Sequence, residues 1–352
     1  MTTIKSVSVS EMADFQTCRC YWWWSAYGPD GSGGLSPKQF QLALFIGNGV
    51  HAGLEAFYRK NKSREKALAA VDRWLQSESQ SIFKQTPYGE KDLVRQIESA
   101  SQLIRGMIAN YVDFDNDPDQ LLIEPIAVIE GKPSIERRIR VPIRHPDSGE
   151  ETGVVLSGRI DLILGDLSSL TIVDHKTYGS EPDFRALDID EQITCYYYLL
   201  YRLTGEVAYR AIYNCLIKQI PQPPERLQRG GFSKAKSQMT TYEVYRRALE
   251  ASGEPIEKYV DILNHLAAQR WGAFFKQQET TRNISELDAF ERRVFYRVEE
   301  MQRVADDPSN LAYPTPSTRG CMYCPFREPC KAADDGGDSA WLLNTYFTKR
   351  NY

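Results

Sequence analysis

The stretch 154–177 constrains the fold most strongly, because it sets charged side chains within two apolar segments. Two runs rich in Val, Ile and Leu flank a polar turn at 165–169, a pattern typical of a β-hairpin. A short hairpin loop sets Asp161 opposite Asp174 or one residue from it, and Lys176 points to the same face as Asp174. Charges in an apolar setting are costly unless they are paired. The pattern predicts either a buried Asp–Lys ion pair or a divalent metal held by the two acids beside the lysine.

Length, charge and hydropathy limit the kinds of protein to which such a site belongs. The chain has 352 residues, enough for a sizeable core in one large domain or two. Its formal net charge of −4 indicates no global basic field for nucleic acid, although a local acidic metal site is compatible with it. Apolar runs are shorter than the roughly 18 residues of a membrane span, and residues 1–6 lack the apolar core of a signal peptide. We therefore expect a cytoplasmic protein without membrane contact.

The hydrophobic periodicity predicts an α/β fold. Apolar residues recur at helical spacing up to about residue 114 and then change to a period of two through the central hairpin. The order strand, strand, helix, strand that follows indicates a mixed sheet. Helices are expected within 8–27 and at 40–59, 63–79, 91–114, 190–204, 240–250, 255–277 and 285–306, and strands at 121–130, 135–144, 154–164, 170–177 and 209–216.

The seven cysteines fall into two groups. Their number is odd and the expected compartment is reducing, so a disulfide framework is not expected. Cys195 and Cys215 lie inside predicted elements and fit core positions. The other five lie near the two chain ends, where four thiolates would suit zinc or an iron–sulfur cluster and would tie the termini together. These five are Cys18, Cys20, Cys321, Cys324 and Cys330.

Several other features allow two interpretations each. The tryptophans 22–24 either anchor the N-terminal segment or stack on a base. His51, in a glycine-containing amphipathic helix, is either an ordinary packed histidine or a functional one. The basic segment 218–236 is either a lid near a substrate or a plain surface loop. The arginines of 137–144 either contact phosphates or form a solvated face.

Together the motifs resemble those of the PD-(D/E)XK nuclease superfamily. Gly158-Arg-Ile-Asp161 resembles its G-x-x-D motif, and Asp174-His-Lys176 resembles its D/E-x-K motif. The segment Gln192-Ile-Thr-Cys-Tyr196 resembles the Q-x-x-x-Y helix motif, and His51 lies in a Gly-x-x-x-His-x-x-Leu-Glu pattern like the first motif.

The terminal cysteines narrow the resemblance to one branch. Phe15-Gln-Thr-Cys18, followed far downstream by the last three cysteines, is similar to the RecB-type branch with a four-cysteine [4Fe–4S] cluster. AddB-type and CRISPR-associated exonucleases and their phage relatives belong to that branch. Cys20 competes with Cys18 as the first ligand, and the helical phase with Phe15 favours Cys18. The cluster ligands implied are Cys18, Cys321, Cys324 and Cys330.

The resemblance implies a restriction-endonuclease-like core with a mixed central sheet flanked by helices, helical additions, and an iron–sulfur clasp joining the terminal segments. It implies one nuclease domain over 1–352. The parts expected within it are a segment with the first cluster cysteine (1–36), a helical part (37–120), the nuclease core (121–220), a helical insertion (221–310) and the C-terminal cysteine cluster (311–352).

The resemblance also implies metal-dependent phosphodiester hydrolysis. Bound Mg²⁺ or Mn²⁺ would supply an activated water and neutralise charge on the scissile phosphate, beside a lysine that positions the water or stabilises negative charge. The cluster would be structural, because it joins chain ends far from the acids. The implied catalytic residues are Asp161, Asp174, Lys176, Gln192 and Tyr196, and the implied metal ligands are His51, Asp161, Asp174 and the backbone carbonyl of His175.

The implied activity is that of a DNA exonuclease acting on DNA ends, often of single strands, in repair, recombination or phage DNA processing in a bacterial or phage-infected cell. No G-x-x-x-x-G-K-S/T motif is present, so any helicase or recombination motor would be a separate chain. Two alternatives stay open: a DNA-binding or assembly component with weak nuclease activity, and a zinc-stapled scaffold with a structural ion pair.

Overall fold

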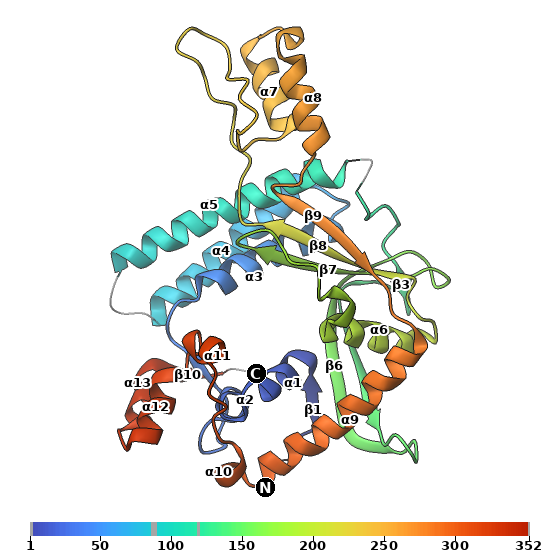
Figure 1. The fold of residues 1–352 in the computed structure, drawn as a ribbon, viewed down its shortest axis with the longest axis vertical. Coiled ribbons are helices and arrows are strands. Elements are labelled where there is room, and N and C mark those ends of the chain that lie inside the picture. The colour runs from blue at the N-terminus through green and yellow to red at the C-terminus, as the bar shows by residue number, and fades with distance from the viewer. Residues whose placement is uncertain (1–2, 86–89, 118–119, 351–352) are drawn as a thin grey trace.

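The computed structural model describes residues 3–85, 90–117 and 120–350. A six-stranded mixed sheet forms its centre (Figure 1). The hairpin is confirmed, since Leu162 pairs with Val173 and Leu164 with Thr171 in antiparallel register. Along the sheet the order is β1 (Ser6–Ser8), β6 (Glu151–Leu164), β7 (Thr171–Tyr178), β8 (Arg210–Ile217) and β9 (Phe275–Thr280), with β5 (Ile135–Arg144) also paired to β6.

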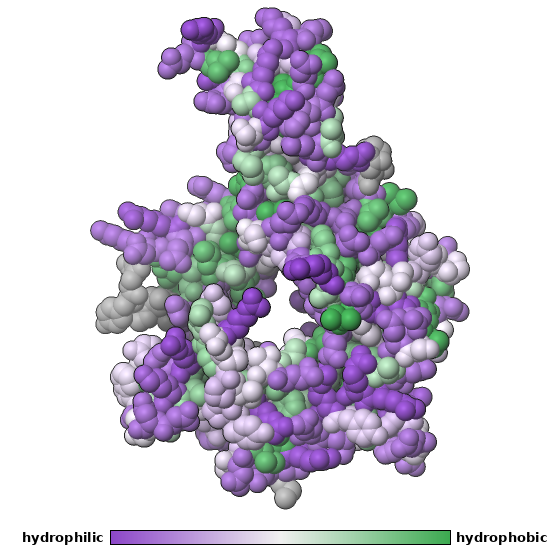
Figure 2. All heavy atoms as spheres, in the orientation of Figure 1, coloured by the Kyte–Doolittle hydropathy of each residue, from purple (hydrophilic) through white to green (hydrophobic). Residues whose placement is uncertain are grey.

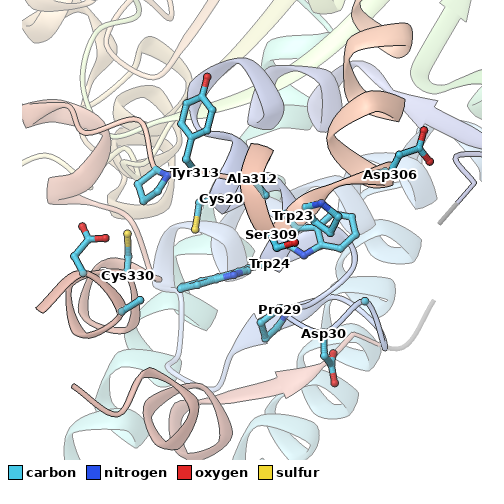
Figure 3. Close-up of a pocket in the computed structure, with 16 residues that line it drawn as sticks. Cys20, Trp23, Trp24, Pro29, Asp30, Asp306, Ser309, Ala312, Tyr313 and Cys330 are labelled. Carbon is cyan, nitrogen blue, oxygen red and sulfur yellow. The ribbon is translucent and has the colours of Figure 1, made fainter. Parts of the chain in front are cut away.

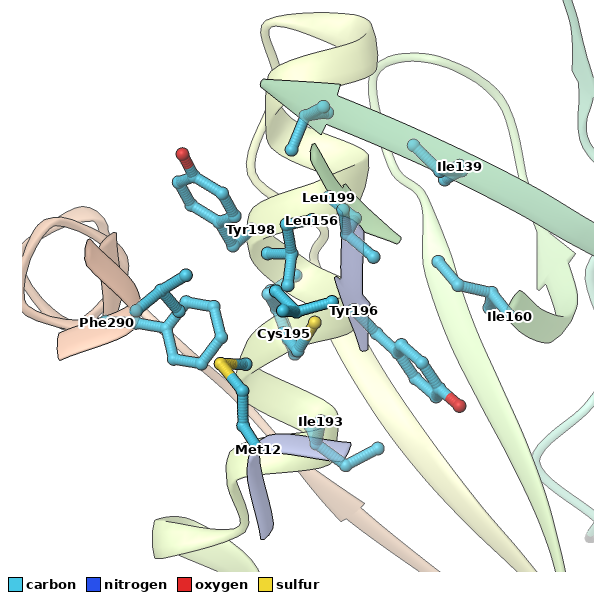
Figure 4. Packing of buried hydrophobic residues seen from close by; sticks show 14 of the residues in the cluster. Met12, Ile139, Leu156, Ile160, Ile193, Cys195, Tyr196, Tyr198, Leu199 and Phe290 are labelled. Atoms are coloured by element: carbon cyan, nitrogen blue, oxygen red, sulfur yellow. The ribbon is translucent and has the colours of Figure 1, made fainter. Parts of the chain in front are cut away.

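Helices cover both faces of this sheet, which confirms the predicted α/β class. On one face, the first three long helices pack their apolar sides on the sheet in one core. On the other face, Figure 4 shows Cys195 and Leu199 of α6 among Met12 of α1 and Phe290 of α9, in a second core. The helices are α3 (Leu42–Arg59), α4 (Arg64–Gln85) and α5 (Glu90–Asp115) on the first face, and α1 (Val9–Thr17), α6 (Glu191–Thr204) and α9 (Ile284–Asp306) on the second.

Strand β6 changes its partner along one edge. Strand β5 runs beside one edge from Val155 to Leu162. On the other edge β1 pairs only as far as Ser157, and β7 begins at Leu162. Residues 158–161 therefore have no partner strand on that edge among the described residues, and this gap holds the aspartate of the G-x-x-D motif.

The chain ends come together beside the sheet. Strand β2 (Leu35–Pro37) pairs with β10 (Phe347–Lys349), so the terminal segments are joined by backbone hydrogen bonds. Trp22 and Trp23 are buried in the core, which supports the anchoring interpretation of the tryptophan run. The other helices of this region are α2 (Arg19–Ala26), α10 (Pro308–Leu311), α11 (Thr318–Met322), α12 (Arg327–Asp335) and α13 (Ser339–Tyr346).

An opening passes through the molecule between this terminal region and the sheet (Figure 2). In Figure 1 it is bordered by α3, β7, β6 with α6, and α1 with α11. The chain closes this ring covalently on one side, through residues 38–41 that lead from β2 into α3. On the other side β1 closes it by pairing with β6, where Met12 and Phe15 of α1 are also buried.

A projection, residues 221–270, is inserted between β8 and β9 and extends away from the sheet (Figure 1). It has its own small core, which includes Phe232, Tyr245 and Tyr259. Arg247 of the projection pairs with Asp113 of α5 at 2.6 Å and anchors it to the body. Its helical elements are α7 (Tyr242–Ser252), η2 (Ile256–Tyr259) and α8 (Val260–Gln269).

Two sequence-based expectations are wrong in detail. The helix expected through residue 277 ends at Gln269, because Arg270 adopts a left-handed φ of 50°, and 275–280 then form β9 of the central sheet. The strand expected at 121–130 is limited to β3 (Val128–Ile129), which pairs with β4 (Lys132–Pro133), and an isolated bridge at Ile126. A short η1 (Leu187–Ile189) precedes α6. Within the described ranges, no helix is long and apolar enough to cross a bilayer.

Candidate active site

A cavity of about 410 Å³ lies in the gap where β6 changes partner. Of the elements that line it, α1, α3, α6, β6 and β7 also border the opening in Figure 1. Its lining residues come from seven elements and include all the side chains singled out in the hairpin and in the Q-x-x-x-Y helix. They are Ser8, Val9, Ser10, His51, Arg138, Ser157, Gly158, Arg159, Asp161, Asp174, Lys176, Gln192 and Tyr196.

The two aspartates lie beside each other at the end of the β6–β7 ladder. Asp161 precedes Leu162 and Asp174 follows Val173, which are partners in that ladder. The carboxylate of Asp161 also accepts a hydrogen bond from the backbone N–H of His175 at 2.8 Å. The expectation that the hairpin sets the two acids opposite or nearly opposite each other is met.

A chain of polar contacts links β7 to α6. The ammonium nitrogen of Lys176 lies 2.9 Å from Oδ2 of Asp174 and donates to Oε1 of Gln192 at 2.7 Å. Gln192 in turn donates to the hydroxyl of Tyr196 at 2.7 Å. Figure 4 shows that hydroxyl pointing away from the hydrophobic cluster around α6. The glutamine therefore fixes the position of the lysine, and the tyrosine fixes the glutamine.

Gly158 allows α6 to pack this closely. A Cβ atom built on Gly158 would lie 2.5 Å from Cδ1 of Leu199 and 3.6 Å from the ring of Tyr196. Real Cβ atoms do not tolerate the shorter of these distances in a packed core. The glycine of the G-x-x-D motif is therefore explained by the approach of the Q-x-x-x-Y helix.

His51 of α3 faces the acids from the opposite side. Its Nδ1 lies 3.6 Å from Asp161 and 3.8 Å from Glu136 of β5. The ligand atoms of these three residues lie within 4.8 Å of one another, the spacing of a possible metal site. Glu136 is also paired to Arg159 at 2.9 Å.

Glu136 was not anticipated from the sequence. Its φ of 50° is left-handed, which is uncommon and strained for a residue with a side chain. Strand β6, which pairs with β5 at this level, is also irregular there, because Ile160 belongs to one core and Leu162 to the other. Residues two apart on a regular strand share a face. This local distortion brings Glu136 to the site, and its sequence signal is only an acid among arginines.

Burial controls the protonation of these groups. It raises the pKa of Asp161 to about 7, against the opposing influence of His51. It also raises the pKa of Asp174, opposed by Lys176. For His51, burial lowers the pKa, but the hydrogen bond to Glu136 and the charge of Asp161 outweigh it and leave the pKa raised. Because burial penalises the charged form of both carboxylates, a cation bound between them would offset that cost.

The His175 side chain lies outside the cavity. Strand alternation turns it to the other face, where its Nδ1 contacts the amide nitrogen of Asn214 at 2.9 Å and its ring stacks on Tyr58. Burial lowers its pKa well below the usual range, so it packs as a neutral ring. Only its main chain is at the site, and the expected carbonyl ligand stays a prediction.

Comparison with known proteins gives the family. A family model for the PD-(D/E)XK nuclease superfamily matches residues 6–331. The chain belongs to this superfamily. No curated protein matches. A crystal structure from Eubacterium rectale, described as a putative exonuclease, has 14% sequence identity and a TM-score of 0.34, and the match covers 74% of this chain and 82% of that chain.

Membership of the superfamily makes this chain a nuclease, a class that uses divalent metals and acts on DNA. The residues present fit such an ion, because the carboxylates of Glu136 and Asp161 and the imidazole of His51 converge on one largely buried site. Oδ2 of Asp174 is buried without a well-directed hydrogen bond, although Lys176 lies nearby. A metal ion bound here would share this oxygen with the ammonium group of Lys176.

The five terminal cysteines of this nuclease gather around one cavity of about 500 Å³, called here the cysteine clasp. Cys18 Sγ accepts from the N–H of Thr315 at 3.4 Å, a contact between opposite ends of the chain. Figure 3 shows Cys20 and Cys330 at a neighbouring cavity that Trp24 also lines. Burial, reinforced by the neighbouring thiols, raises the pKa of Cys20, Cys324 and Cys330.

Proposed function

We propose that this nuclease is a metal-dependent exonuclease that hydrolyses phosphodiester bonds at free ends of single-stranded DNA. The observation that supports this most is that several elements lining the cavity with Asp161 and Asp174 also border the opening through the molecule. The opening is closed on one side by the covalent chain and on the other by the pairing of β1 with β6. A DNA strand can pass through it only from a free end, which a closed circle of DNA lacks. Arg138 and Arg159 line the cavity beside the acids and suit contacts to the phosphates of such a strand.

In this proposal, Asp161, Asp174 and His51 hold Mg²⁺ or Mn²⁺, with Glu136 as an additional ligand and the carbonyl of His175 as another. The ion supplies a water of lowered pKa and neutralises phosphate charge. Lys176, held by Asp174 and Gln192, positions the attacking water or stabilises the charge that develops on the phosphate. Tyr196 keeps Gln192 in place or holds the strand.

We also propose that the cysteine clasp carries a [4Fe–4S] cluster on Cys18, Cys321, Cys324 and Cys330. A tetrahedral zinc ion with Zn–S bonds of about 2.3 Å would draw its sulfurs to within about 3.8 Å of one another. No three of the clasp's sulfurs lie within 4.8 Å of one another in the described part of the chain. What supports a shared cluster is that these four cysteines, from opposite ends of the chain, line one cavity. Its role would be structural, because it joins the chain ends.

The biological setting proposed is DNA repair, recombination or phage DNA processing in the cytoplasm, with any helicase or recombination partner as a separate chain. We also propose that the chain consists of a nuclease core, terminal parts and an inserted part. The inserted part in this proposal is the projection, residues 221–270, and not the whole of 221–310.

The test is digestion of end-labelled linear and closed circular single-stranded DNA, with protein prepared without air and with Mn²⁺, Mg²⁺ or EDTA. We expect metal-dependent loss of the linear strand alone, and no loss with Lys176→Ala. Cutting of the circle would refute the exonuclease, and folded protein that cuts neither would favour a binding component.

A further inference from the structure

The projection carries a strongly basic loop that contributes no residue to the lining of the cavity. We call residues 221–240 the arm. The arm holds four cations and one carboxylate, Glu225, in a chain that is net negative. All four cations are exposed, and they lie at Arg226, Arg229, Lys234 and Lys236.

The arm is an ordered structure with many internal contacts. Arg226 and Phe232 form a β-bridge around a tight turn at 227–231. The N–H of Phe232 donates to the Tyr259 hydroxyl at 3.0 Å, which ties the turn to the helices of the projection. Gln238 donates to the carbonyl of Ser233 at 2.8 Å and closes the loop on itself. The cations are therefore held on a fixed platform.

Two of the cations rest on aromatic rings of that platform. The guanidinium carbon of Arg226 lies 5.4 Å from the centre of the Phe232 ring, and the ammonium of Lys234 lies 5.3 Å from that of Tyr259. Such cation–π contacts orient a charge without neutralising it. None of the four arm cations has an ion pair with a described acidic residue, whereas Arg246 and Arg247 of the adjacent α7 are both paired.

We propose that the arm is a second nucleic-acid contact that binds the phosphate backbone of the DNA outside the opening. Four exposed cations, pre-ordered and without acidic partners among the described residues, suit contacts to several phosphates. The inference rests on the proposed function for its choice of DNA, but it concerns binding and needs no turnover. The proposal gives a role to the inserted segment, none of whose residues lines the cavity.

The composition of the arm favours nucleic acid over an acidic protein. Between the cations lie Gln228, Gly230, Gly231, Ser233 and Ala235, which are small or polar, together with the exposed Leu227 and the buried Phe232. Backbone amides and short polar side chains are common partners of phosphate oxygens. Protein interfaces are instead anchored by buried aromatic and large apolar residues. Of the arm's large apolar side chains, Phe232 is committed to the projection's core, and the exposed Leu227 and Met239 are outnumbered by the four exposed cations.

The test compares the wild type with R226Q/R229Q/K234Q/K236Q in equilibrium binding, in EDTA and on the Lys176→Ala background so that nothing is cut. The control, K66Q/R73Q/K91Q/R292Q, removes the same charge from exposed positions on α4, α5 and α9. Closed circular single-stranded DNA is the main probe, because it cannot thread the ring and reports the arm separately. A strand of about 10 nucleotides, the scale of one binding site, reports the cavity.

We expect the arm variant to lose binding to the circle while it keeps the short strand, and the control to keep both. Each lost phosphate contact lowers the salt slope by about 0.7, so four contacts lower it by about 3. Between 50 and 200 mM salt the wild type would then weaken about 50-fold more than the variant on the circle.

Equal binding of the circle by the wild type and the arm variant would overturn the proposal, as would wild-type protein that does not bind the circle. Since R226Q and K234Q change contacts with aromatic rings, R229Q/K236Q is a second variant that leaves the platform intact, and about half the slope change is expected. Digestion assays are separate, so a failure of the exonuclease proposal would be distinguishable from a failure of the arm.

Discussion

Replacing Asp161 with Asn should stabilise the metal-free protein at alkaline pH. The Asp161 side chain is 8% exposed, and burial raises its pKa from 3.8 to about 7. The folded state therefore binds this proton more tightly than the unfolded state does. The stability that Asp161 contributes when protonated is present below pH 4 and is lost as the pH rises to 7. Asparagine keeps the shape and the acceptor for the His175 N–H without a charge.

The magnitude follows from the pKa difference. A shift of about three units corresponds to about 4 kcal/mol at pH 8, and this is the upper end because His51 and Asp174 titrate with Asp161. An unfolding entropy of about 2.1 cal/mol/K per residue gives about 0.74 kcal/mol/K for 352 residues. The melting temperature of Asp161→Asn should therefore rise by up to about 5 °C at pH 8 and by only about 2 °C at pH 5, where about 1.6 kcal/mol of the contribution has been lost.

Thermal unfolding in EDTA at pH 5, 6, 7 and 8, followed by circular dichroism, measures this effect. Asp288→Asn is the control, an exposed aspartate on the outside of α9. Added Mn²⁺ should raise the melting temperature of the wild type at pH 8 and leave the variant unchanged. A melting temperature that falls in the variant at pH 8, or that changes equally at pH 5 and pH 8, would show that the buried charge is not the cause.

Three further outcomes are expected. Glu136→Gln should weaken Mn²⁺ binding about 10- to 100-fold in calorimetry without DNA, because the site loses a charged ligand that faces His51. Gly158→Ala should lower stability by about 1–3 kcal/mol in urea unfolding, because its Cβ meets Leu199, and Leu199→Ala should restore part of the loss. Cys324→Ser should remove iron and brown colour from anaerobically prepared protein, measured as iron per chain and visible absorbance.

Each of these has a matched control. Glu130→Gln removes an exposed acid paired to Arg137 and should leave Mn²⁺ affinity unchanged. Gly179→Ala adds a Cβ that meets no atom within 4 Å, and it should not alter stability. Cys195→Ala removes a buried thiol outside the clasp and should keep the iron. Zinc in a colourless wild-type protein would contradict the cluster, and an unchanged Mn²⁺ affinity in Glu136→Gln would remove it from the ligand set.

Local patterns predicted much of the core. The alternating apolar runs around 165–169 gave the hairpin and hence the neighbouring aspartates, because strand register follows from alternation and turn length. The spacing of Gln192 and Tyr196 on a helix gave their shared face, and they are hydrogen-bonded. These features depend only on the period of a strand or helix.

Other features depend on distant parts of the chain or on local distortion. The pairing of β1 with β6, which creates the gap at 158–161, joins segments about 150 residues apart. The left-handed backbone of Glu136 leaves no trace in the periodicity of the sequence. Ile135 and Ile139 are four residues apart, which on a regular strand would put them on the same face, but they belong to different cores. The strand at 275–280 has no alternating apolar pattern to predict it, because its one buried apolar residue, Phe275, stands at its first position.

The joining of the chain ends has a consequence for how the protein is made. Cys18 contacts the backbone of Thr315 across 297 positions, and β2 can pair with β10 only after residues 347–349 have been synthesised. Contacts this distant in sequence slow folding, because the loop between them must be ordered first. On the ribosome the N-terminal segment emerges early and its apolar tryptophans wait for partners. The terminal region therefore matures last, and a nascent chain has an assembled sheet before it has a finished clasp.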